Sequence, residues 1–155
     1  MKKLLIMTLP LLIITGANAD HHKKGEGKTD GDGAPVRMES PKGAKAYIVL
    51  PKDGKTVKKK FKVIFGLRNM GIAPAGIKFP NTGHHHLLID ADEKDYDFSK
   101  PLPASDNCKH FGGGQTEAML ELAPGKHTLQ LVLGDHLHIP HNPPVVSEKI
   151  TITVE

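Results

Sequence analysis

Apolar residues recur at every second position along several short segments of the chain, and glycine or proline residues separate these segments. In residues 60–67 this applies to four side chains: Phe61, Val63, Phe65 and Leu67. A two-residue repeat is typical of a β-strand with one buried face, and no segment shows the 3.6-residue repeat of an amphipathic helix. The pattern predicts strands at 45–50, 57–67, 84–90, 116–122, 127–134 and 146–154.

The order of these strands favours an all-β fold, an immunoglobulin-like β-sandwich of about seven strands. The clearest indication is residues 124–135, where a Pro124-Gly125 turn precedes leucines at 129, 131 and 133. This arrangement resembles the penultimate strand of an immunoglobulin-like domain. His127 shares the parity of these leucines, so we expect it to face the core and to be hydrogen-bonded.

The N-terminal residues have the features of an export signal. Lys2 and Lys3 precede an apolar run at 4–14, and Ala17-Asn18-Ala19 is a small-residue cleavage pattern. We expect residues 1–19 to be a signal peptide, 20–40 a flexible tail rich in Gly, Lys and His, and 41–155 the folded domain. The predicted location is the bacterial periplasm or the exterior, without stable membrane insertion after cleavage.

Charge and cysteine content narrow the possible partners. The whole chain has a net charge of +4, and removal of Lys2 and Lys3 would leave +2. No basic segment is interleaved with aromatic residues, so the sequence does not favour nucleic acid as a partner. The single cysteine, Cys108, has no internal partner for a disulfide. It is therefore a metal ligand, a dimer bridge or a protected thiol.

Histidines supply the candidate chemistry. Eight of the ten lie in three groups, which are His21-His22, His84-His85-His86, and His136, His138 and His141. The neutral imidazole is a common metal ligand. In an immunoglobulin-like order, the connections that carry the second and third groups lie at the same end of the sandwich as His110. The sequence therefore predicts a metal site there, formed by His84, His86, His110, His136, His138 and His141.

Strand geometry refines this prediction. Residues two apart in a strand share a face, so His84 and His86 can reach one ion together, on the outer face or the rim. His85 has the parity of Leu87 and Ile89 and points toward the core. If the strand begins after His85, that residue is a further possible ligand. The triple glycine at 112–114 predicts either a close approach of the backbone or a simple loop.

Imidazole donors favour copper first and zinc second. A separate site is predicted at the mature terminus, where the free amine of Asp20, two amide nitrogens of the backbone and the His22 imidazole can bind copper(II) or nickel(II) in a plane, beside His21. This second site depends on cleavage after Ala19.

Three segments resemble a family of bacterial exported proteins known as domain of unknown function four-three-nine-nine. They are residues 81–90 (Asn-Thr-Gly-His-His-His-Leu-Leu-Ile-Asp), 110–117 (His-Phe-Gly-Gly-Gly-Gln-Thr-Glu) and 124–144. The resemblance covers roughly residues 45–154 and implies no established activity. It implies a polar signature that includes Gln115, Glu117 and Asp135, which we expect to support the ligands without binding metal. Cys108 is not part of that signature, so we do not expect it to bind the metal.

Three functions fit these observations. The first is a metal-binding protein that buffers or delivers copper or zinc. The second is a structural or interaction module of the envelope, whose histidines hydrogen-bond to carboxylates and loop carbonyls without metal. The third is a copper-dependent redox enzyme with chemistry like that of superoxide dismutase, for which Asp135 or Glu117 would orient an imidazole or act as a base.

Overall fold

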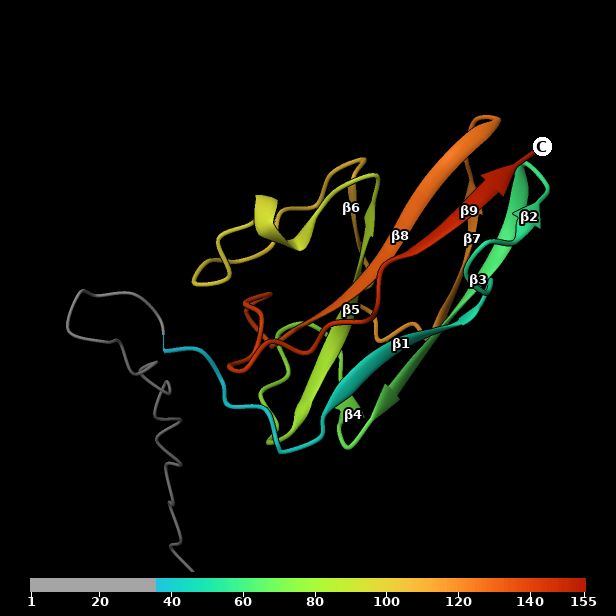
Figure 1. Cartoon of the computed structure of the whole chain (residues 1–155). Coiled ribbons are helices and arrows are strands. Elements are labelled where there is room, and N and C mark those ends of the chain that lie inside the picture. The colour runs from blue at the N-terminus through green and yellow to red at the C-terminus, as the bar shows by residue number, and fades with distance from the viewer. Residues whose placement is uncertain (1–35) are drawn as a thin grey trace, which may run out of the picture.

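Two β-sheets pack face to face in the computed structural model of the chain, which describes residues 36–155 (Figure 1). The three-stranded sheet has the order β1-β3-β7, formed by Lys45–Leu50, Lys60–Arg68 and Glu117–Glu121. The larger sheet has the order β2-β9-β8-β5-β4, formed by Thr56–Val57, Ile150–Val154, Gly125–Gly134, Thr82–Ile89 and Gly71–Ile72. Strand β6 (Cys108–His110) also pairs with β5, and a single 3₁₀ turn, η1, spans Glu93–Asp95.

The predicted all-β, immunoglobulin-like fold is confirmed. The first, second and fourth predicted strands form one sheet as β1, β3 and β7, and the others form the second sheet as β5, β8 and β9. Two boundaries differ from the prediction. Val57, the first residue of the second predicted strand, lies instead in β2, which pairs in parallel with β9. The last strand begins at Ile150, and ahead of it Val146 makes an isolated bridge to Val132.

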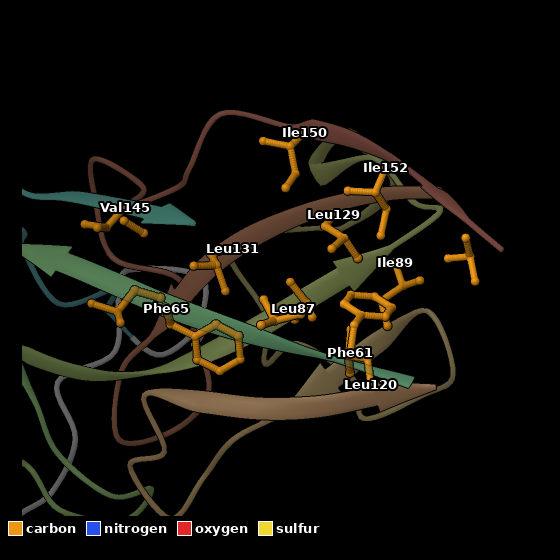
Figure 2. Packing of buried hydrophobic residues seen from close by; sticks show 14 residues of the cluster. Phe61, Phe65, Leu87, Ile89, Leu120, Leu129, Leu131, Val145, Ile150 and Ile152 are labelled. Atoms are coloured by element: carbon orange, nitrogen blue, oxygen red, sulfur yellow. The ribbon is translucent and has the colours of Figure 1, made fainter. Parts of the chain in front are cut away.

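The main core lies between the two sheets. Alternate residues of β3, β5, β8 and β9 point into this space, as Figure 2 shows for Phe65, Leu87, Leu129, Leu131 and Ile152. Each of these side chains is at most 5% exposed. Burial of one such side chain contributes about 1.5–3 kcal/mol to the free energy of unfolding. The two-residue repeat in the sequence therefore accounts for the packing of the sandwich.

A second, smaller core covers the opposite face of the larger sheet. Leu88 of β5 and Val132 of β8 point away from the main core and contact Leu102 and Cys108. Tyr96 and Phe98, from the segment between β5 and β6, pack against the same cluster. Two histidines on this strand require a correction. His84 and His86 lie on the predicted outer face of β5, but they are 0% exposed rather than at an open rim.

Residues 36–40 run beside the loop that follows β8. The Arg37 guanidinium donates hydrogen bonds to the backbone oxygens of Pro140 and His141. The backbone of Asn142 exchanges hydrogen bonds with Met38 and Ser40 at 2.9 and 3.1 Å. These five residues, which the sequence assigned to the tail, thus contact the folded domain.

The predicted signal peptide, the tail up to residue 35 and the predicted terminal site at Asp20, His21 and His22 lie outside the described residues. Within residues 36–155, none of the helical structure is long and apolar enough to cross a membrane.

Candidate metal centre

Four histidines from three segments meet on the outer face of the larger sheet. His84 and His86 share one face of β5 because they are two residues apart in a strand. His110, the last residue of β6, is the direct cross-strand partner of His86, so its side chain points to the same face. His138 comes from the loop after β8. We refer to these four residues as the four-histidine cluster.

The rings of the four-histidine cluster are close enough to share one ion. All six distances between ring centroids lie between 4.6 and 6.0 Å. Each residue offers one ring nitrogen, and these nitrogens lie within 4.8 Å of one another. A tetrahedral ion bound at about 2.0–2.1 Å from each nitrogen requires nitrogen separations of about 3.3 Å. His84 Nε2 and His138 Nδ1 are 3.2 Å apart, which matches this separation, and the other nitrogen separations lie within about 1.5 Å of it.

Two glycines leave the space that these rings occupy. A Cβ atom at Gly134 of β8 would lie 2.7 Å from Cε1 of His86, and one at Gly112 would lie 2.3 Å from Cε1 of His110. Any side chain at either position would displace the imidazole. Of the two alternatives predicted for the triple glycine, each applies to a different residue. Gly112 allows a close approach, and Gly114, with a φ of +80°, forms the turn.

The loop that carries His138 is held by a buried carboxylate. Asp135 is 1% exposed, and its Oδ1 accepts hydrogen bonds from the backbone N–H groups of Leu137 at 2.8 Å and Ile139 at 3.0 Å. The N–H of His138 donates to the backbone oxygen of Asp135 at 2.9 Å. His138 itself has a φ of +67°, in the left-handed region that side chains other than glycine rarely adopt. The loop geometry therefore fixes where this imidazole points.

Burial keeps the inner imidazoles uncharged. Desolvation, followed by repulsion from neighbouring histidines, lowers the pKa of His86 to about 2 and the pKa of His84 to about 4. The pKa of the exposed His110 is also lowered, by desolvation and by His138. A neutral imidazole has a lone pair available for a metal. The cluster thus offers nitrogen donors rather than positive charges.

Several buried ring nitrogens have no hydrogen-bond partner. In the cluster these are both nitrogens of His86 and Nδ1 of His84, and outside it both nitrogens of His85 and Nδ1 of His136. Buried polar atoms in folded proteins are almost always hydrogen-bonded, and an unpaired one costs about 1–3 kcal/mol. A bound metal ion would use the lone pair of one nitrogen in each ring of the cluster.

The other predicted ligands lie outside the four-histidine cluster. His85 points to the other face of β5 and packs on the Phe65 ring, with centroids 5.2 Å apart. His141 is fully buried, and its ring nitrogens lie 3.2 and 3.5 Å from the backbone oxygens of Thr82 and Leu133. It therefore ties the loop after β8 to the sheet. Nδ1 of His136 is 4.0 Å from an Asp135 carboxylate oxygen.

Two of the three predicted supporting residues make their contacts elsewhere. Gln115 is exposed, and its side-chain oxygen accepts from Gly113 N at 3.0 Å within its own loop. Glu117 forms an exposed ion pair with Lys62 at 2.7 Å on the three-stranded sheet. Asp135 is the one that shapes a segment of the site. Sequence reasoning did not single out Gly134, although a glycine within a strand pattern is itself a signal of close approach.

The remaining histidine and the cysteine are also accounted for. His127 lies 2.7 Å from a carboxylate oxygen of Asp90 and 2.8 Å from the backbone oxygen of Ala123. It is hydrogen-bonded, as expected. Cys108 is a free, fully buried thiol of the smaller core, and burial raises its pKa to about 11.

Residues 63–155 match the family described as "Domain of unknown function (DUF4399)". The sequence matches no curated protein. Among solved structures, the chain is similar to part of an endo-β-1,4-mannanase from Thermotoga petrophila, with 18% sequence identity and a TM-score of 0.42. The similarity covers 72% of this chain and 20% of that chain, so the chain spans about one fifth of the mannanase.

Proposed function

Because the chain belongs to the family described as "Domain of unknown function (DUF4399)", whose description names no activity, we propose a function from the site: the four-histidine cluster binds one transition-metal ion. His84 and His86 would bind it from β5, His110 from β6 and His138 from the loop after β8. Cys108 takes no part, since its thiol lies in the smaller core.

The unpartnered nitrogens of His86 carry this proposal. A purely structural module would be expected to pair its buried imidazoles with carboxylates or carbonyls. His127 and His141 have such partners, whereas His86, at 0% exposure, has none. His85 is equally buried and unpartnered, but it packs on the Phe65 ring, so only at His86 do the unpartnered nitrogens coincide with three further imidazoles. The four neutral imidazoles of the cluster match the ligand set of a metal site.

The donor set favours copper(II) first and zinc second. Imidazole suits both ions, and the cluster contains no thiolate, thioether or carboxylate. Without an anionic ligand, the complex keeps the full charge of the ion, and His110 leaves one side of the site exposed. These features suit reversible binding, so we infer a role in buffering or delivering the metal after export to the bacterial periplasm.

Metal content after dialysis tests the proposal. The untagged protein, loaded with copper(II) or zinc and dialysed, is expected to retain about one ion per chain, measured by elemental analysis. The double variant H86A/H138A is expected to retain none, because two of the four donors are gone. The variant H127A is the matched control, since His127 is also a partly buried histidine but contacts Asp90, outside the cluster.

Equal retention by H86A/H138A and the parent, with far-UV circular dichroism showing both folded, would rule out the cluster as the site. Nitrogen hyperfine structure in the electron paramagnetic resonance spectrum of the copper(II) form would identify imidazole ligation. Competition between copper and zinc for the same protein shows which metal binds with the higher affinity.

A further inference from the structure

The four histidines of the cluster differ sharply in exposure. His84 and His86 are 0% exposed, His138 is partly buried, and His110 is exposed. A ligand that leaves a metal must find another partner for its nitrogen. For His86 no partner is present within the fold, so its departure would leave unpaired buried atoms. For His110, water takes that place. Dissociation of His110 is therefore the least costly way to open the site.

The backbone around His110 is held by the sheet, so dissociation of this ligand would be a movement of its side chain alone. His110 ends a three-residue strand and is followed by Phe111, whose N–H donates to the backbone oxygen of His85 at 3.0 Å. The glycines at 112–114 come next. Gly112 lies against the imidazole, where a Cβ atom would be 2.5 Å from its Nε2. The ring thus packs closely on the Gly112 backbone, and this position of the ring requires a glycine there.

From this difference in burial we propose that His110 is the ligand that leaves the metal when the ion enters or departs. This inference rests on the metal-binding function proposed above. His84, His86 and His138 hold the ion, and the ion is loaded and released on the His110 side. In the step itself, a donor atom of the acceptor forms a bond to the ion as the bond from the His110 nitrogen breaks. The freed nitrogen hydrogen-bonds to water. The charge on the ion does not change, and no oxidant or reductant is needed.

Transfer of zinc to a chromophoric chelator tests this proposal. The zinc-loaded protein is mixed with excess 4-(2-pyridylazo)resorcinol in a stopped-flow instrument. H110A is expected to bind one zinc but to release it at least about tenfold faster than the parent, because the fourth position is already open. H86A is expected to lose stoichiometric binding altogether.

A steric variant keeps every histidine and separates the role of His110 from loss of a side chain. In G112A the new methyl group occupies the place of the His110 ring, and Gly112 lacks the positive φ that would make alanine a strained choice. G112A is expected to reproduce the fast release of H110A. G113A is the control, because the three atoms nearest to a Cβ there all belong to the exposed Gln115 side chain, at 3.0–3.3 Å. It is expected to release zinc at the parental rate.

The results distinguish this inference from the function on which it rests. If the parent protein binds neither zinc nor copper, the proposed function is wrong. If the parent binds metal and H110A loses it as completely as H86A, His110 is an equal ligand and the inference is overturned. Release from folded H110A and G112A at the parental rate overturns it as well.

Discussion

Asp135 is the single residue on which the shape of the ligand loop most depends. Its carboxylate accepts two backbone hydrogen bonds inside the protein, from Leu137 and Ile139. Hydrogen bonds to a charged group contribute about 1.5–3 kcal/mol each, and their donors would be left unpaired without it. We expect D135A to lower the free energy of unfolding by about 2–4 kcal/mol, measured by urea denaturation.

The same change is expected to weaken metal binding by freeing His138, measured by titration calorimetry. D135N is the matched variant, because its side-chain oxygen still accepts hydrogen bonds from the backbone. It should retain most of the metal affinity. Equal affinity in D135A and the parent would show that the loop does not depend on this carboxylate.

His127 gives a pH dependence at the scale of one residue. The hydrogen bond with Asp90 raises the pKa of His127 above its usual 6.5, more than burial lowers it. A raised pKa in the folded state means that the pair stabilises the protein fully below pH 6.5, and that this stabilisation is lost as the pH rises through the folded-state pKa. The contribution of such a pair is about 0.5 kcal/mol.

The difference in unfolding free energy between the parent and H127Q is therefore expected to shrink between pH 6 and pH 8.5, followed by chemical denaturation. Taking the difference between the two unfolding free energies at each pH cancels the contribution of the histidines that both proteins share. A difference that stays constant over this range would contradict the raised pKa.

The pairing of β5 with β8 builds the site at the scale of elements. His84 of β5 lies opposite Gly134 of β8, and His86 lies opposite Val132. The missing side chain at Gly134 leaves space for the His86 ring. G134A would place a methyl group 2.7 Å from the His86 ring. We expect it to lower the free energy of unfolding by about 1–3 kcal/mol, which is typical of an overpacked core.

G134A is also expected to weaken metal binding, measured by the same titration as for Asp135. The substitution G54A is a suitable comparison for the thermodynamics of glycine replacement, because its Cβ meets nothing within 4 Å, although its φ of +72° adds local strain. If G134A binds metal as the parent does, the close approach of Gly134 to His86 is not needed for the site.

At the scale of the whole molecule, metal binding and folding are linked. The cluster joins β5, β6 and the loop after β8, which come together only in the folded chain. An ion that binds only the folded state stabilises it by RT ln(1 + [L]/Kd), about 2.7 kcal/mol at a free concentration of 100 Kd. The melting temperature of the parent is expected to rise by several degrees with added zinc or copper.

For a domain of this size, between the small and the medium-sized domains, each 1 kcal/mol shifts the melting temperature by about 4 °C. H86A/H138A should show no such shift in differential scanning calorimetry, whereas H127A should. A rise of the same size in H86A/H138A would place the metal elsewhere on the chain.

The sequence by itself determined the sandwich and indicated that histidines from distant segments come together. Alternating apolar residues fix which face of each strand is buried, and antiparallel order then brings distant connections together. The separation of His84 and His86 from His85 followed from the same parity, and the structure keeps His85 against Phe65. The buried face of each strand follows from local periodicity, which can be read from one segment without knowledge of the rest of the chain.

Only the tertiary structure decided which histidines share a point and how deeply they are buried. His84 and His86 are fully buried on the face of β5 that parity alone assigned to the outside of the sandwich. The positive φ of His138 brings its ring to the cluster, while His141, three residues later, turns to backbone oxygens. The position and burial of each ring depend on loop conformation and on contacts between segments far apart in sequence. Neither produces a periodic pattern in the sequence.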